Sequence, residues 1–599
     1  MGGENCFAST LMRASRFSAS FLVLAIVCGI AVASPQTKAA GGAVSTVYQS
    51  GVAAFQRGDL PAARSAFEKA VKVNPHNADA QNMLGQVLLQ QGEVDDAIVR
   101  FRTLVKLRPS LAVAHAYLAQ ALEIKGRPDD AMVEFRLAVQ FAPKQWQAHQ
   151  ALGRALSLQH ETDEAIVEFK QAILLEPKQA ELHDELGSLL AQESKFSDAE
   201  KEFREAMLSA DFEPAYFHLG ATLFSEGSTK EAQEVLDHAV QLDPKDATAW
   251  YYRGEVLETE GSRDEALQSY EHAVELQPNA APLQTRFGML LQRRGDAERA
   301  VAAFSKAVAL TPSDAEAHNN LALALLQRGD ADAAIKEFRE AIRIHPDDAD
   351  LQGNLGTAYL QKTDFTGAIA QFREALKLDP EKASLHYDLA LALKFSDDLP
   401  AAIAEWKEAI RRDPKLADAY YSLGVTLWQS GDFPAAAEQL QQAIKIRPDY
   451  TEAYYTLGTV LKQMNKLPEA ADALRHAIQL DPDFAGAHTT LAAVLRQLGD
   501  VAGAEAESKA GAAMAKQKTD LQAATFATNS GRRLLDAGDL EGAISQFRAA
   551  LRALPSYALA HYELGLALSQ KGLKDEAAGE YRKAAELDPH LAAPPTSAR

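Results

Sequence analysis

Residues 417–450, ADAYYSLGVTLWQSGDFPAAAEQLQQAIKIRPDY, carry two short runs of apolar and small side chains at helical spacing. In the first run these side chains recur at i, i+3, i+4 and i+7, which is one face of a helix: Tyr420, Leu423, Gly424 and Leu427. The second run forms the same kind of face with Ala436, Leu440, Ala443 and Ile444. Neither helix could bury its apolar face alone, so each needs the other and a neighbouring pair.

Turn residues separate the two predicted helices and end the second one. Ser430, Gly431 and Asp432 interrupt the helical pattern, and Pro434 falls in the first turn of the second helix, where its missing N–H costs nothing. Pro448 marks the end of that helix. The stretch therefore predicts a helix–turn–helix unit of 34 residues.

The chain repeats this unit sixteen times, from Val44 to Leu591. Position 20 of the unit is alanine in every copy, from Ala63 to Ala577, and position 8 is always glycine or alanine. Position 24 is aromatic in twelve copies and position 32 is proline in fourteen. Because two helices approach closely only where side chains are small, positions 8 and 20 predict the contact within each pair.

A period of 34 residues with this pattern resembles the tetratricopeptide repeat family over most of the chain. The resemblance implies an all-α fold, a right-handed superhelical α-solenoid of helix–turn–helix repeats without a single central core. It also implies that the first helix of each unit lines a concave groove through its positions 2, 5, 6, 9, 12 and 13.

Charge and cysteine content narrow the possible partners. The formal net charge of −21 argues against nucleic acid and anionic lipid surfaces, which need a basic stripe. The two cysteines, Cys6 and Cys28, both precede the first repeat, so no disulfide or cysteine-based metal site is expected within the repeats. This composition is compatible with an oxidising compartment.

The first 33 residues differ in kind from the repeats. Arg13 and Arg16 precede an apolar run from Phe21 to Ala33 that ends in Ala-Val-Ala, the pattern of a secretory signal peptide cut before Ser34. The alternative is an uncleaved membrane anchor formed by residues 17–33, the only membrane contact we expect. Residues 34–43 form a small, flexible linker. The sequence thus predicts an exported protein, periplasmic or extracellular.

Two irregularities interrupt the spacing. In the fifth unit Asp211 replaces the usual proline and one residue is missing, which predicts a kink. The fourteenth unit degenerates, so its second helix either continues as one long helix or frays into a linker. The chain then divides into repeats 1–14 (44–518), a junction (519–523), repeats 15–16 (524–591) and a tail (592–599). Without an obvious polar capping helix, the last repeats are expected to self-associate or to meet a partner.

No catalytic motif is found, and we expect neither an enzyme nor a cofactor. The motifs sought were a phosphate-binding loop, a nucleophile elbow, a zinc-protease motif and a dinucleotide loop. Histidine recurs at position 4 in seven repeats, but stacked helices lie too far apart for these rings to share one metal ion. The histidines are His115, His149, His183, His318, His386, His488 and His561. A half-buried packing position that accepts any flat ring accounts for them.

Aromatic side chains gather at groove positions between residues 383 and 484. Position 5 is tyrosine in three successive repeats, and also at Tyr251 and Tyr562. Because tyrosine and tryptophan provide a large contact area with a polar tip, this region predicts a groove for an extended peptide. Its candidate residues are Tyr387, Tyr421, Tyr455, Lys394, Phe395, Trp428, Gln429, Lys462 and Gln463. The alternative is that tyrosine is simply the usual residue of the family at position 5.

Asn320 and Asn354 occupy position 6 and are similar to the asparagine ladder of O-linked N-acetylglucosamine transferases. Only Asn529 joins them, so most of the ladder is absent. The Lys-x-x-x-Asn pair by which chaperone-adaptor repeats clamp a carboxylate is found in no repeat.

The function expected from the sequence is a non-enzymatic scaffold of an exported bacterial protein, which binds partner proteins or extended peptides. The resemblance extends to assembly and secretion factors of the cell envelope. A targeting arm for a separate enzyme, like the repeats of the glycosyltransferases above, is one alternative. A self-assembling scaffold is the other.

Overall fold

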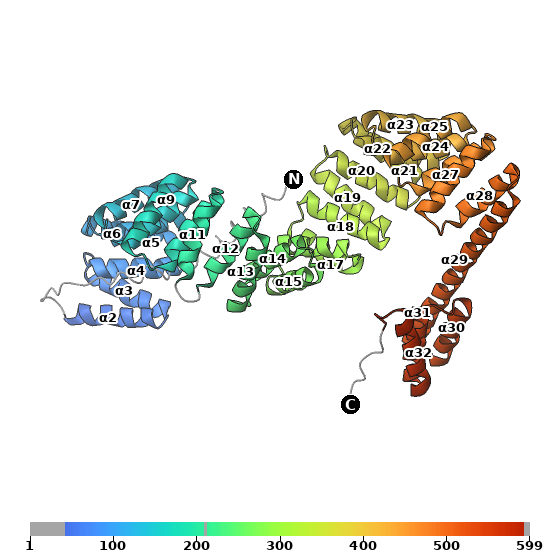
Figure 1. The fold of residues 1–599 in the computed structure, drawn as a ribbon. Helices are drawn as coiled ribbons and strands as arrows, with labels where there is room; N and C mark the ends of the chain where they lie inside the picture. Colours follow the sequence, from blue (N-terminus) through green and yellow to red (C-terminus); the bar gives the residue numbers. More distant parts are fainter. Residues whose placement is uncertain (1–41, 209–211, 592–599) are drawn as a thin grey trace. The chain divides into compact units, whose positions relative to one another are not determined.

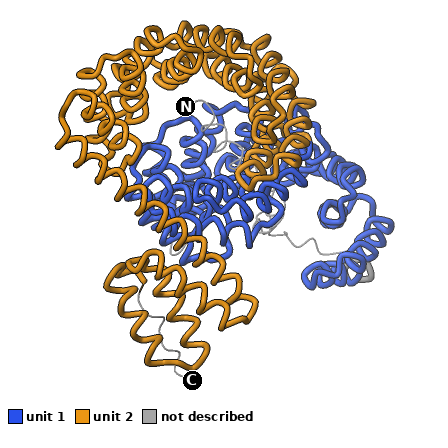
Figure 2. Tube along the Cα trace, turned by 90° about the vertical axis from the view of Figure 1, so that its right-hand side faces the viewer, with its two compact units in different colours: residues 1–312 blue, residues 313–599 orange. Residues whose placement is uncertain are grey.

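The computed structural model describes residues 42–208 and 212–591 and contains two compact units, Met1–Pro312 and Ser313–Arg599 (Figure 2). The described residues form 31 helices and no strands, and consecutive helices pack against each other in pairs (Figure 1). The all-α fold and its helix–turn–helix organisation are therefore confirmed. The predicted signal peptide (1–33) and tail (592–599) lie outside the described residues, as does the linker up to residue 41.

The described residues of unit 1 form eight helix pairs. Their first helices are α2 (Gly42–Gln56), α4 (Ala78–Gln90), α6 (Ala112–Ile124), α8 (Trp146–Leu158), α10 (Ala180–Gln192), α12 (Glu213–Glu226), α14 (Ala247–Thr259) and α16 (Ala281–Arg293). Their second helices are α3 (Leu60–Val73), α5 (Val94–Leu107), α7 (Pro128–Phe141), α9 (Thr162–Leu175), α11 (Phe196–Met207), α13 (Thr229–Leu242), α15 (Arg263–Leu276) and α17 (Ala297–Leu310).

Unit 2 continues the pattern up to one long helix, α29 (Val501–Asp536). Its other first helices are α18 (Ala315–Arg328), α20 (Ala349–Gln361), α22 (Ala383–Phe395), α24 (Ala417–Gln429), α26 (Thr451–Gln463), α28 (Ala485–Leu498) and α31 (Ala558–Gln570). Its other second helices are α19 (Ala331–Ile344), α21 (Phe365–Leu378), α23 (Leu399–Arg412), α25 (Phe433–Ile446), α27 (Leu467–Leu480), α30 (Leu540–Ala553) and α32 (Lys574–Leu587).

The turn within each pair follows from a few residues. Between α24 and α25, Gly431 takes a φ of 85°, which glycine adopts without steric cost. Asp432 then caps α25 by accepting a hydrogen bond from the Ala435 N–H, and Pro434 lies in the first turn. Where glycine is missing from this turn, other residues take the same positive φ: His160, Ser194, Thr363, Asp397 and Asn465.

Close approach within each pair explains the small residues at position 8. A Cβ atom on Gly85 would lie 2.6 Å from the Phe101 ring, which is itself fully buried. Ala97, at position 20 of the same repeat, is also fully buried. The aromatic side chain at position 24 thus fills the space above position 8 of its own repeat, and the small residues predicted at positions 8 and 20 lie where the two helices approach closely.

The irregular fifth repeat is seen only in part, because residues 209–211 lie outside the described residues. Helix α11 has 12 residues, whereas α9 and α13 on either side have 14. The predicted kink at this repeat stays a prediction.

Helix α29 resolves the two alternatives for the fourteenth repeat. Its 36 residues form one continuous helix that includes residues 519–523. The N-terminal part buries Ala504 and Gly511, and the C-terminal part buries Ala524, Ala527, Thr528 and Gly531. Residues 512–523 between them are exposed or half-buried. One helix therefore serves both the fourteenth and the fifteenth repeat.

Candidate functional site

The structure places all eight predicted partner-binding residues in unit 2, on five successive first helices: α18, α20, α22, α24 and α26. Tyr387, Tyr421 and Tyr455, which we call the tyrosine row, are each half-buried. The Tyr387 hydroxyl lies 3.3 Å from the Ser422 hydroxyl on the neighbouring first helix. The row therefore follows the stacking direction, as the register of the repeats predicted.

Each of the last two tyrosines packs against an aromatic ring from the turn before the next repeat. The rings of Tyr421 and Tyr450 have centroids 4.9 Å apart, and those of Tyr455 and Phe484 are 4.8 Å apart. Burial raises the pKa of Tyr421, so its hydroxyl stays protonated at neutral pH. The aromatic surface therefore includes residues of the turns, Tyr450 and Phe484, beside the tyrosine row.

Tyr450 is held in place by two charged side chains. Its hydroxyl donates a 3.0 Å hydrogen bond to Asp418, and the Arg447 guanidinium lies 4.5 Å from its ring centroid. Arg447 also pairs with Asp418 at 2.7 Å and, with the hydroxyl, holds the pKa of that carboxyl below its usual range. This arrangement fixes the ring before any partner binds, which reduces the entropy lost on binding.

Trp428 and Lys394 lie at the opposite end of the first helices, at position 12. Trp428 donates a 2.7 Å hydrogen bond from its indole N–H to Gln463 on the next first helix. The Lys394 ammonium lies 5.9 Å from the Trp406 ring centroid, and burial lowers its pKa. Phe395 does not join the tyrosines but stacks on Phe365 at 5.6 Å.

The two predicted asparagines differ in accessibility. Asn354 donates a 2.9 Å hydrogen bond to Asn319 and is half-buried. Asn320 is 9% exposed, and its side-chain amide nitrogen has no hydrogen-bond partner among the described residues. The structure therefore brings Asn319 and Asn354 together, and Asn320 is turned mostly inward.

A tyrosine at position 5 is not always accessible in the groove. Tyr251 in unit 1 is only 2% exposed and donates a 2.9 Å hydrogen bond to Glu255, which pairs with Arg286 at 2.7 Å. The rings of Tyr252 and Tyr270 pack near its ring, with centroids 5.4 and 5.8 Å away. The same residue type at the same position is thus a core residue in one repeat and half-exposed in another.

Asp388 is a polar group on α22 that the sequence analysis missed. Burial raises its pKa to about 6, and no ion pair or hydrogen bond involves its side chain among the described residues. Its place at position 6, next to Tyr387, is the signal that could have identified it.

The histidines at position 4 form a repeated contact rather than a generic packing position. In all seven repeats the ring Nδ1 lies 2.5–2.7 Å from the carboxylate of the glutamate nineteen residues later. Six of the rings also place Nε2 2.9–3.2 Å from the carbonyl oxygen of the proline six residues earlier. The described residues contain no cluster that could hold a metal ion.

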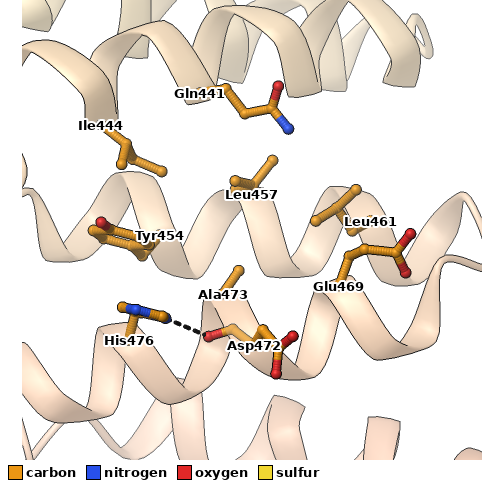
Figure 3. A pocket seen from close by; sticks show the side chains of 9 residues that line it. All are labelled: Gln441, Ile444, Tyr454, Leu457, Leu461, Glu469, Asp472, Ala473 and His476. Carbon is orange, nitrogen blue, oxygen red and sulfur yellow. Dashed lines mark hydrogen bonds between the residues drawn. The ribbon is translucent and has the colours of Figure 1, made fainter.

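A different arrangement is present where position 4 carries an aromatic residue. Tyr454 stacks on His476 with centroids 5.4 Å apart, and both line a cavity of about 330 Å³ between α25, α26 and α27 (Figure 3). Trp250 and His272 repeat this pairing at 4.8 Å beside a cavity of about 290 Å³ in unit 1. Both cavities lie at repeats without the histidine–glutamate contact.

Family models of the tetratricopeptide repeat match the chain in several stretches: 48–110, 88–145, 213–246, 356–394, 387–451, 427–476, 455–516 and 528–592. The model of the cytochrome c-type biogenesis protein H TPR domain matches residues 233–350. The chain belongs to the tetratricopeptide repeat family. Membership supports a protein-interaction scaffold, and this fold is typically non-catalytic.

A comparison with curated proteins finds no match. Among solved structures, the chain is similar to the APC/C hetero-tetramer Cut9–Hcn1, with a TM-score of 0.35 and 17% identity over 76% of this chain and 97% of that one. The chain is also similar to yeast Tom70, with a TM-score of 0.32 and 16% identity over 70% of this chain and 96% of that one. YrrB is described as a TPR protein with an unusual peptide-binding site. The chain is similar to it with a TM-score of 0.26 and 26% identity, over 31% of this chain and 96% of that one. In the part of the chain that the structure describes, no helix has the length and apolarity needed to cross a membrane.

Proposed function

We propose that this protein is an exported scaffold that holds an extended segment of a partner protein against the first helices α22, α24 and α26. The observation that carries the proposal is the tyrosine row with its added rings, Tyr450 and Phe484. These rings are half-exposed and fixed by hydrogen bonds and packing, and aromatic side chains of this kind dominate binding energy at protein interfaces.

A role in assembly or secretion at the cell envelope is part of the proposal. The basic residues and apolar run before Ser34 support export. The match to the cytochrome c-type biogenesis protein H repeat domain supports a biogenesis role. Mass spectrometry of the mature N-terminus tests export: a chain that begins at Ser34 is expected, and an intact segment 1–33 would contradict cleavage.

Affinity capture from an envelope extract tests the partner-binding surface. The triple variant Tyr387→Ala, Tyr421→Ala, Tyr455→Ala is compared with the unchanged protein. Phe141→Ala serves as the matched control, because Phe141 is an aromatic residue of α7 that is 39% exposed and far along the chain from the row. All three proteins must first show equal helicity.

We expect a partner that the unchanged protein and the control capture and the triple variant loses. Equal capture by all three would reject the tyrosine row as the binding surface. If the captured partner is an enzyme, the protein acts as its targeting arm and binds it through the same tyrosine row.

Self-association through the C-terminal repeats is a second candidate, favoured by Phe526. Position 3 of a first helix is buried wherever a complete repeat precedes it, as at Leu351 and Leu385. Phe526 occupies this position but is exposed, because α29 continues from the fourteenth repeat without folding back. Sedimentation over a range of concentrations is expected to show association that Phe526→Asp removes; a monomer at every concentration would exclude it.

A further inference from the structure

Three basic side chains occupy position 12 of first helices in unit 2: Lys394 on α22, Lys462 on α26 and Arg496 on α28. We call these residues the cation row. Trp428 holds the same position on α24, between Lys394 and Lys462. Lys394 and Lys462 are half-buried and Arg496 is exposed. None of the three forms an ion pair with a carboxylate of the described residues.

Some exposed lysines elsewhere reach a carboxylate of the preceding repeat, as Lys125 does with Asp95 at 2.6 Å and Lys362 with Asp332 at 2.6 Å, whereas the cation row has no such partner among the described residues. The protein has 82 acidic side chains against 61 basic ones, so basic side chains at the same position of three first helices differ from the acidic character of the whole chain. Lys394 is also partly desolvated, which lowers its pKa and makes an external anion favourable there.

Hydrogen bonds join the neighbouring first helices α22, α24 and α26. Tyr387 reaches Ser422 across α22 and α24, and Trp428 reaches Gln463 across α24 and α26. Packed helices lie about 8–10 Å apart, so the row extends over roughly 25 Å. An extended chain rises about 3.3 Å per residue, and about eight residues would cover this distance.

We propose that the cation row recognises an acidic extended segment, whose carboxylates pair with Lys394, Lys462 and Arg496 while an apolar side chain packs on Trp428. This inference rests on the proposed function and names the chemistry of the partner. Complementary charge sets the register and the rate of association, and the aromatic rings supply contact area.

Fluorescence anisotropy of a labelled deca-glutamate peptide with the full chain tests the inference. We expect binding that the triple variant Lys394→Gln, Lys462→Gln, Arg496→Gln weakens at least tenfold. Binding is also expected to weaken between 50 and 200 mM salt, because solvent ions screen exposed charges. Glutamine keeps the length and polarity of the side chains, and thermal unfolding confirms that the variant is folded.

Asp388→Asn is the matched control, because it removes a charge of opposite sign from the same helix as Lys394. We expect it to leave deca-glutamate binding unchanged or to strengthen it. Equal binding of deca-glutamate by the unchanged protein and the triple variant would overturn the inference. So would tighter binding of a deca-lysine peptide that Asp388→Asn alone removes.

The two proposals can fail separately. If the tyrosine variant loses its captured partner while the cation variant retains it, the scaffold function stands and the acidic partner class is wrong. If the cation variant loses deca-glutamate while the tyrosine variant captures its partner normally, the cation row is a binding surface and the tyrosine row is not.

Discussion

His183 and Glu202 connect the two helices of the fifth repeat, with the ring Nδ1 2.7 Å from the glutamate Oε2. The ring Nε2 lies 3.1 Å from the carbonyl oxygen of Pro177, an atom that can only accept. A neutral imidazole has one donor, so the ring satisfies both acceptors fully only as an imidazolium. The hydrogen bond with Glu202, more than any other cause, raises the pKa of His183.

The raised pKa makes this contact sensitive to pH. A group whose pKa is higher in the folded state stabilises that state below its unfolded pKa of about 6.5, and the stabilisation is lost as pH rises through the folded pKa. We expect His183→Gln to lower the stability of this repeat by about 1–2 kcal/mol at pH 6 and by less at pH 9.

Hydrogen exchange of α10 and α11 measures this local stability at each pH. Glutamine is the appropriate replacement because Gln284, at position 4 of the eighth repeat, donates a 3.0 Å hydrogen bond to the Pro278 carbonyl. The variant thus keeps the carbonyl contact and loses only the charged one. A destabilisation that stays constant or grows with pH would contradict the imidazolium.

Gly85→Ala is expected to destabilise the second repeat by about 1–3 kcal/mol, the usual cost of overpacking a core. The added Cβ would lie 2.6 Å from the buried Phe101 ring, which is packed on all sides. Gly579→Ala is the control, because Gly579 lies within α32 with no atom within 4 Å of the added Cβ. There alanine is expected to stabilise the helix by up to about 1 kcal/mol. Hydrogen exchange of the two repeats compares the variants, and a neutral Gly85→Ala would show that the ring can move.

The middle of α29 is expected to open more readily than its ends. Residues 512–523 are helical but their side chains are exposed or half-buried, whereas the flanking parts of α29 pack into repeats. The amides of residues 512–523 should therefore exchange faster than those of the flanking parts. Gln517→Pro is expected to break the helix there and to leave repeats 15 and 16 folded. Their cores, which include Phe547, Leu564 and Tyr581, lie beyond the break. Limited proteolysis should cut the proline variant near this site and leave Gln517→Ala intact; uniform protection along α29 would contradict the expectation.

The sequence predicted the fold well because the repeat encodes its own packing. Gly85 and Ala97 could be placed from their register alone, since positions 8 and 20 carry small residues in every copy. The histidine contact was missed, although glutamate follows each of the seven histidines at a spacing of nineteen. That spacing joins two helices, and only their antiparallel packing shows that the two side chains meet.

The candidate site was less predictable than the fold. Tyr251 and Tyr387 share position 5, but the first is buried against other tyrosine rings and the second is half-exposed. Accessibility depends on side chains of adjacent repeats, which differ from copy to copy. The added ring of Tyr450 comes from a turn, and its position depends on Asp418 and Arg447. Register therefore identifies which residues share a face, whereas exposure requires the structure.

Asp388→Asn is expected to stabilise the protein at neutral pH but not at pH 4. Burial raises the pKa of Asp388 to about 6, above the value of about 3.9 in an unfolded chain. Between these two pH values the folded state binds more protons than the unfolded state, so folding stability falls as pH rises. Asparagine has no such transition and fits the same space. Thermal unfolding at pH 4 and pH 7.5 should show a higher midpoint for the variant only at pH 7.5, with a gain of about 1–2 kcal/mol in this repeat. An equal gain at both pH values would mean that the carboxylate is well solvated and that its shape, not its charge, determines the effect.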